Sequence, residues 1–268
     1  MRYFIAFLLI GICCVLLCCK VNQLPNPKGV CTPTNEFSEE RAMNHVKVLS
    51  EEIGPRTATD KHQIERTRNY INQFIEYLSP TANSNGWKIV TVNLPVSGEY
   101  YWNHIQYVYQ NLNNLLIKIE PMNSNNHLCQ GALLTNVHID SAVSSPAAGD
   151  DGVAVSIALE SIRALISIPS HENNFPYYFL FNNGEELGLL GSHGFVTQHP
   201  DIIEQIGAFI NLEAAGTYGP ESLFQAGPKS DTVGQYSKHV PFPRGSVVVR
   251  TFNYVFLFYL YSNLLFCE

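Results

Sequence analysis

The sequence of 268 residues predicts an α/β fold, in which a mixed central sheet carries helices on both faces. Three observations predict it. Apolar runs of strand length alternate along the chain with segments whose apolar residues recur at helical spacing. That alternation is typical of a sheet covered by helices on both sides. Histidine and carboxylate side chains follow directly after several of the apolar runs, at the strand ends where such sheets collect ligands.

Composition sets the limits of this interpretation. Hydrophobic residues make up 46% of the chain and charged residues 15%, which is enough for one sizeable core, with or without membrane segments. The formal net charge is -7, and no basic cluster appears in the sequence. A protein that binds nucleic acid normally has a basic face, so the sequence argues against a nucleic-acid partner.

The chain begins with an uncharged apolar run from Tyr3 to Cys19, with Arg2 before it and Lys20 after it. The run is about as long as a short membrane span requires. A cleaved signal peptide usually has a shorter apolar core and a small-x-small cleavage site, which is missing here. We therefore predict a signal anchor or transmembrane helix over residues 1–20, and a Pro-containing linker over residues 21–36.

Two amphipathic helices are predicted next, followed by strands. Ser38 is the expected N-cap of the first helix, and Gly54-Pro55 is its expected end. The second helix is expected from Asp60 to Leu78, with Pro80 beyond it. From Trp87 the apolar period changes to two, which is typical of a strand. The predicted strands are 87–94, 106–109, 114–120, 132–137, 177–181 and 208–212, and further helices are predicted at 152–165 and 187–197.

Candidate metal ligands follow the ends of three of these strands. His138 and Asp140 are two residues apart, so an extended chain places their side chains on one face. A Gly-rich turn then brings two aspartates to the start of a helix, where free backbone N–H groups tolerate negative charge. The acidic candidates are Asp150, Asp151, Glu185, Glu186 and Glu213. An imidazole with several carboxylates is the ligand set that borderline metals such as zinc prefer.

Four stretches resemble the motif series of the co-catalytic two-zinc aminopeptidase family, whose relatives include leucyl aminopeptidase and glutaminyl cyclase. They are Asn136-Val-His-Ile-Asp-Ser, Gly149-Asp-Asp-Gly-Val, Phe181-Asn-Asn-Gly-Glu-Glu-Leu-Gly-Leu-Leu-Gly-Ser-His-Gly-Phe and Asn211-Leu-Glu-Ala-Ala-Gly. Two more stretches, Gly191–Pro200 and Glu39–Arg56, are similar to the membrane-anchored branch of this family. The resemblance covers about residues 35–249.

The resemblance implies a zinc-dependent metallopeptidase of the aminopeptidase type, which acts on peptide or protein substrates. It also implies residence in the endoplasmic reticulum membrane, with a lumenal catalytic domain. Asp140 would be the residue that orients His138. Glu185 would be the general base that takes a proton from the metal-activated water when a peptide bond is hydrolysed.

Two Zn2+ ions are expected from the same resemblance. His138 would bind one of them, and Glu186 would complete its ligands. Asp150 would bridge both ions, and Glu213 would bind the second. Asp151 is expected to cap a helix or to support a neighbouring group, because Asp150 occupies the bridging position.

The sequence departs from the family pattern after Glu213. The second zinc of the family also needs a histidine on a later loop, and the only later histidine is His239, whose surroundings look like a helix end. We do not assign His239 to the site. We predict a truncated zinc peptidase-like domain over residues 37–249, and a divergent apolar tail over residues 250–268. The tail is interpreted as the product of an altered reading frame or retained intron, with a second membrane segment and a buried strand pair as alternatives.

Two other functions stay open because of this departure. The chain could be a non-catalytic truncated isoform, or a binding relative that keeps a peptide-binding or metal-binding surface. It could also be a glutaminyl-cyclase-like acyl transferase with a single zinc. The number of bound zinc ions separates these functions from a two-zinc peptidase.

Overall fold

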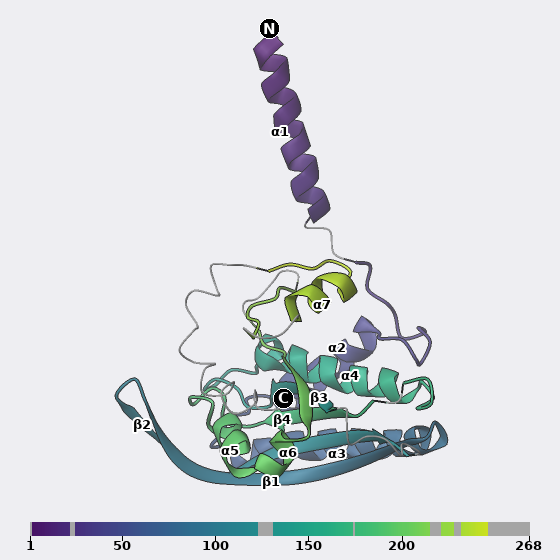
Figure 1. The fold of residues 1–268 in the computed structure, drawn as a ribbon. Coiled ribbons are helices and arrows are strands. Elements are labelled where there is room, and N and C mark those ends of the chain that lie inside the picture. The colour runs from purple at the N-terminus through teal and green to yellow at the C-terminus, as the bar shows by residue number, and fades with distance from the viewer. Residues whose placement is uncertain are drawn as a thin grey trace. The chain divides into compact units, whose positions relative to one another are not determined.

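A computed structural model describes residues 2–21, 25–122, 131–173, 175–214, 221–227 and 232–245 (Figure 1). The chain divides into two compact units. The larger unit includes Lys28–Thr217, and the smaller unit combines Met1–Pro27 with Tyr218–Phe252. The predicted apolar tail, residues 250–268, lies outside the described residues.

The larger unit is built on a five-stranded sheet with the order β1-β2-β4-β3-β5. Strand β2 is antiparallel to both of its neighbours, β1 and β4, whereas β3 runs parallel to both β4 and β5. The predicted mixed sheet is therefore confirmed. The five strands are β1 Trp87–Trp102, β2 Ile105–Pro121, β3 Ala132–His138, β4 Tyr177–Asn182 and β5 Ile206–Asn211.

Helices cover both faces of this sheet, as predicted (Figure 1). On one face, alternate residues of β2 such as Ile117 pack with η1, α3 and α4 in the main hydrophobic core. On the other face, Leu116 of β2 packs with α5 and α6 in a second core. The helices of this unit are α2 Glu39–Lys47, η1 Val48–Ile53, α3 Lys61–Ser84, η3 Ala148–Val153, α4 Ala154–Ile166, α5 Leu190–Gln198 and α6 Pro200–Ile203.

One predicted strand break is wrong. The Asn-rich segment between residues 109 and 114 was expected to be a turn, but it continues the single strand β2, in which Asn114 pairs with Leu94 of β1. The side chain of Asn114 is fully buried. It donates to the carbonyl of Gly191 at 2.9 Å and accepts from the amide of Asn183 at 3.0 Å. These tertiary hydrogen bonds satisfy a polar side chain whose local preference is for a turn.

The predicted helix starts hold better than the predicted ends. Ser38 Oγ accepts a hydrogen bond from the amide of Arg41 at 3.2 Å, so the predicted N-cap is confirmed. Pro80 was expected beyond the end of its helix, but it lies inside α3, which continues to Ser84. Ala82, which is fully buried in the main core, lies in this extra turn. Packing of the turn offsets the hydrogen bond that Pro80 cannot donate.

The start of the larger unit differs from the predicted boundary at residue 37. Residues from Lys28 onward belong to this unit. The guanidinium of Arg41 donates to the carbonyl oxygens of Val30, Thr32 and Glu36 at 2.8, 2.8 and 2.9 Å. Its Nε donates to the buried carboxylate of Glu160 on α4 at 3.0 Å. Half of the predicted linker is thereby attached to the domain.

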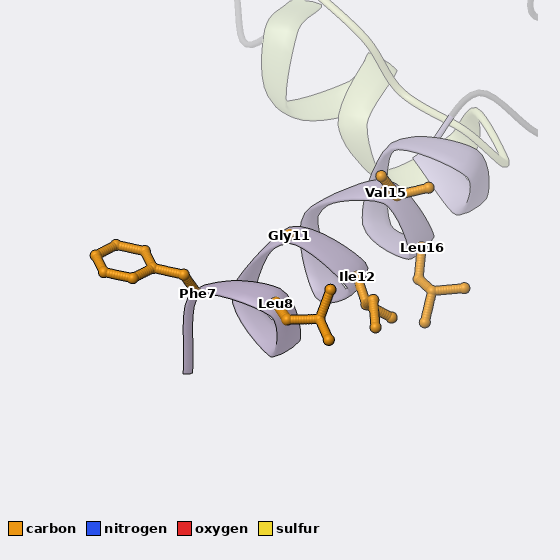
Figure 2. Close-up of a pocket in the computed structure, with 6 residues that line it drawn as sticks. All are labelled: Phe7, Leu8, Gly11, Ile12, Val15 and Leu16. Atoms are coloured by element: carbon orange, nitrogen blue, oxygen red, sulfur yellow. The ribbon is translucent and has the colours of Figure 1, made fainter. Parts of the chain in front are cut away.

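The smaller unit contains two helices, α1 (Arg2–Val21) and α7 (Thr232–His239), among its described residues. Figure 2 shows apolar side chains of α1, among them Leu8, Ile12 and Leu16, that line an open apolar pocket. The predicted apolar helix at the N-terminus is therefore present as a helix. Over the part of the chain that the structure describes, however, we find no helix with the length and apolar character needed to cross a membrane.

His45 of α2 generates a prediction on the pH dependence of stability. Its ring is buried, its Nδ1 lies 2.5 Å from Tyr70 Oη, and its centroid lies 4.5 Å from that of Phe74. Burial lowers the pKa of His45 to about 4 from an ordinary 6.5. Between these two values the unfolded chain binds a proton that the folded chain does not bind. The contribution of His45 to the free energy of unfolding therefore falls as the pH decreases through this range.

We expect His45 to lower the free energy of unfolding by about 2 kcal/mol between about pH 6.5 and about pH 5, measured by urea unfolding as the difference in pH dependence between the wild type and His45→Gln. His45→Gln should reduce this decrease, because glutamine does not titrate. The exposed His62 serves as the control, and His62→Gln should keep the wild-type pH dependence. Equal pH dependence in the wild type and His45→Gln would contradict the assignment.

Candidate metal centre

His138 is the last residue of β3, which lies between β4 and β5 in the sheet. Because β3 has a partner on each side, its end is held firmly, and the His138 side chain is only 1% exposed. The main-chain amide of His138 donates to Asp151 Oδ2 at 3.1 Å. The position and direction of the imidazole are thus fixed by the sheet and by the helix start that follows.

The two ring nitrogens of His138 have different surroundings. Nδ1 donates to the main-chain carbonyl of Asp140 at 3.0 Å, and a carbonyl can only accept, so Nδ1 carries a proton. Nε2 faces carboxylate oxygens of Asp150 at 2.9 Å, Glu213 at 3.5 Å and Glu185 at 4.0 Å. Burial lowers the pKa of His138, but hydrogen bonds with Asp140 and Glu213 and the charge of Asp151 raise it to about 12.

Four side chains form a compact cluster of candidate metal ligands. Among the described residues, His138, Asp150, Asp151 and Glu213 each offer one ligand atom, and these atoms lie within 4.8 Å of one another. His138 and Asp151 are buried, whereas Asp150 and Glu213 are exposed. Three of the four were predicted as metal ligands from the sequence. Asp151 was expected in a different role.

Asp151 does not cap a helix. Neither η3 nor α4 has a side-chain cap, and the Asp151 carboxylate instead accepts the amide of His138. Its other oxygen, Oδ1, is buried and has no hydrogen-bond partner. Burial raises the pKa of Asp151 to about 8; the charge of His138 lowers it, and the charges of Glu213 and Asp150 raise it further. The predicted capping role is therefore wrong, whereas the alternative role, support of a neighbouring group, agrees with the hydrogen bond that Asp151 accepts from His138.

Asp140 is fully buried, and it contacts the segment that contains Glu185 and Glu186. The two carboxylate oxygens of Asp140 accept the main-chain amides of Glu185 and Glu186, at 3.1 and 3.2 Å. Asp140 Oδ1 lies 3.6 Å from His138 Nδ1, whereas the carbonyl oxygen of Asp140 lies 3.0 Å from the same nitrogen. Beyond its predicted contact with His138, Asp140 therefore holds the peptide segment that follows β4.

Glu185 and Glu186 differ in their distance from the cluster. Glu185 Oε2 lies 4.0 Å from His138 Nε2. Burial raises the pKa of Glu185 to about 7, while the charge of His138 opposes this and that of Glu213 adds to it. Glu186 does not belong to the group of four, although burial and the charge of Asp150 raise its pKa. The predicted ligand set is thus brought together except for Glu186.

Two other histidines lie outside the cluster. The ring of His193 stacks on that of Tyr100, with 4.4 Å between the centroids, and its Nδ1 lies 2.7 Å from Tyr109 Oη. His239, which was left unassigned, is the last residue of α7 in the smaller unit. The cluster of described residues therefore contains a single imidazole.

The donor set fits a divalent cation. A buried imidazole faces several carboxylates, and Asp151 keeps one buried oxygen without a hydrogen-bond donor. Such an oxygen is costly unless a proton or a cation satisfies it. Imidazole and carboxylate ligands together suit zinc among the common divalent metals, with other borderline metals as competitors.

Comparison with known proteins agrees with this geometry. Residues 114–260 match the model of peptidase family M28. The chain is 36% identical over 227 residues to endoplasmic reticulum metallopeptidase 1 of Homo sapiens, a match that covers 83% of this chain and 24% of that protein. The chain spans about a quarter of the length of the curated relatives that it matches most fully.

Solved structures share the fold. The LapA aminopeptidase of Legionella pneumophila superposes with a TM-score of 0.58 at 18% identity, covering 84% of this chain and 60% of that chain. BSAP, a zinc aminopeptidase from Bacillus subtilis, superposes with a TM-score of 0.57 at 16% identity, covering 80% of this chain and 81% of that chain. The family match extends over more than half of the sequence, and the predicted relationship is confirmed: the chain belongs to peptidase family M28.

Proposed function

We propose that this chain carries the catalytic centre of a zinc-dependent aminopeptidase that hydrolyses the peptide bond after the N-terminal residue of a peptide or protein. One observation carries the proposal: Nε2 of the buried His138 faces carboxylates of Asp150, Glu213 and Glu185 at the end of a central strand. Membership of peptidase family M28 and the fold shared with zinc aminopeptidases support it.

His138, Asp150 and Glu213 would hold zinc directly, and Glu186 would complete the ligands of one ion. In the metal-free protein, the proton on Nε2 of His138 is the positive charge that faces the carboxylates. A divalent cation would replace that proton and balance more of the negative charge. When bound, zinc supplies Lewis-acid polarisation of a substrate carbonyl and activates water. Two zinc ions are proposed from the family resemblance.

Glu185 is the proposed general base. Its carboxylate lies close to the cluster without being one of its four members, so it is available to a water held there. The pKa of about 7 makes this carboxyl group suited to exchange a proton near neutral pH. Asp140 would support both functions, because it contacts His138 and also binds the amides of Glu185 and Glu186.

We further propose that the protein resides in the endoplasmic reticulum, with its catalytic domain in the lumen, because the relatives are named as endoplasmic reticulum metallopeptidases. Membrane association through α1 is part of the proposal, and the exposed apolar side chains of Phe7, Leu9 and Leu16 support it. Extraction of cell membranes with carbonate tests this association. Release of the chain into the soluble fraction would count against it.

Metal content and turnover test the proposed function together. We expect the full chain, loaded with zinc and dialysed, to retain two zinc ions by mass spectrometry or atomic absorption and to hydrolyse aminoacyl amides. One retained ion without peptidase turnover would favour an acyl transferase. A protein that is folded, binds no zinc and is inactive would favour the non-catalytic relative.

Glu185→Gln should separate catalysis from metal binding. Glutamine has nearly the same shape but cannot take a proton, so we expect turnover to fall by at least about 100-fold. Zinc content should stay at the wild-type value. Glu204→Gln, at an exposed position, is the matched control and should change neither quantity. Loss of zinc in Glu185→Gln would show that Glu185 is a ligand and not the base.

Asp140→Asn should affect both metal binding and stability. An asparagine cannot accept both amides of the Glu pair, since one of its two polar groups is a donor. We expect zinc affinity to fall by about 10-fold to 100-fold, and the unfolding free energy of the metal-free chain by about 1–3 kcal/mol. Competition with a chromogenic chelator and urea unfolding measure these changes. Asp201→Asn, at an exposed position of α6, is the control. Equal zinc affinity in Asp140→Asn and Asp201→Asn would refute the role of Asp140.

A further inference from the structure

A second buried charge lies close to the candidate metal centre. Arg56 follows the Gly54-Pro55 turn after η1, and it is only 1% exposed. Its guanidinium donates to backbone carbonyl oxygens and forms no ion pair among the described residues. The acceptors are Ile139 at 3.0 Å, Leu49 at 2.7 Å, Gly54 at 3.0 Å, Pro146 at 3.0 Å and Ala147 at 3.2 Å.

These carbonyls belong to two segments that are distant in sequence. Leu49 lies near the start of η1 and Gly54 directly follows this helix, whereas the others lie in the loop over residues 139–147. This loop joins His138 and Asp140 to the turn that carries Asp150. The main chain adds two contacts, because the amide of Arg56 donates to Ser141 Oγ at 2.8 Å and its carbonyl accepts the amide of Ser141 at 3.0 Å.

Arg56 therefore binds the loop at both ends. Ile139 and Ser141 lie at its beginning, next to Asp140, and Pro146 and Ala147 lie at its end, just before Asp150. A planar guanidinium with several fixed donors can satisfy carbonyls that point at it from different directions. Because the hydrogen bonds to all of these carbonyls except that of Pro146 are buried, a loop without the guanidinium would leave several carbonyls unsatisfied.

The packing around the guanidinium is tight. A Cβ at Gly152 would lie 2.5 Å from the Ala147 carbonyl oxygen and 3.9 Å from Arg56 Nη2, so the turn closes against the same carbonyl that Arg56 binds. Burial lowers the pKa of Arg56, while the charges of Asp140 and Asp151 raise it. The positive charge of the guanidinium therefore interacts favourably with the carboxylates of Asp140 and Asp151.

We propose that Arg56 is a positioning residue of the candidate metal centre, and that it fixes the loop over residues 139–147 and so the separation of His138 from Asp150 before metal binds. The part of this inference that concerns metal rests on the proposed zinc-dependent function. The part that concerns the loop does not depend on zinc. Arg56 would act through the loop and would touch neither substrate nor metal.

Arg56→Lys tests the inference, because lysine keeps the charge but lacks the fork of donors. The matched control is Arg68→Lys on α3, where a nearly buried arginine binds Glu65 and Asn93 away from the cluster. Hydrogen exchange of the metal-free full chain measures the loop. Competition of zinc with a chelator measures the affinity of the folded protein.

In Arg56→Lys we expect amide exchange over residues 139–152 to be at least about 10-fold faster, with exchange in α3 unchanged. Zinc affinity should be about 10-fold to 100-fold lower. Arg68→Lys should leave both quantities at the wild-type values. Ser141→Ala removes the hydrogen bond that Ser141 Oγ accepts from the Arg56 amide, and it disturbs the structure less. This variant decides the question if Arg56→Lys does not fold. We expect it to change loop exchange and zinc affinity several-fold.

Unchanged loop exchange in a folded Arg56→Lys variant would overturn the inference, and so would unchanged zinc affinity. A uniform increase in exchange across the whole domain would also overturn it, because Arg56 would then only stabilise the fold. If the wild-type chain binds no zinc, the proposed function fails, and loop exchange alone then decides whether Arg56 positions the loop.

Discussion

The structure of the larger unit depends on one constraint: a buried imidazole at the end of the central strand β3 must face several carboxylates. Nδ1 of His138 is occupied by the carbonyl of Asp140, so only Nε2 is directed at Asp150, Glu213 and Glu185. Like charges this close repel each other, and most strongly at the buried end of the cluster, where Asp151 lies. Protons relieve this repulsion in the metal-free protein, because the pKa values of His138, Asp151 and Glu185 are all raised, and a metal cation would balance the charges in their place.

Strand order explains how these residues reach one place. The parallel strands β4, β3 and β5 end at the same edge of the sheet, and each is followed by acidic residues. The Asp140 carboxylate then links two of these ends, because it accepts the amides of Glu185 and Glu186. Arg56 also holds the loop after β3, because its guanidinium donates hydrogen bonds to carbonyl oxygens of that loop. Hydrogen bonds to main-chain groups therefore hold the segments that carry the acidic cluster.

A site of this kind combines rigid and accessible parts. His138 and Asp151 are buried, whereas Asp150 and Glu213 are exposed, so the cluster has one side in the protein and one side open. This asymmetry suits an enzyme centre, where buried groups fix the geometry and exposed groups meet the substrate. It also suits the exchange of a proton between Glu185 and a bound water, since Glu185 is partly buried.

The sequence alone determined the alternation of strands and helices, the N-cap at Ser38, and most residues of the candidate site. Such features depend on local periodicity and on short motifs, which are visible in one stretch of chain. Tertiary structure decided the rest. It joined two predicted strands through Asn114, carried α3 past Pro80, and gave Asp151 a main-chain partner in β3. It also placed Arg56 against carbonyls more than 80 residues away. Such hydrogen bonds join groups that are distant in sequence and meet only in the packed tertiary structure, so no local pattern in the sequence encodes them.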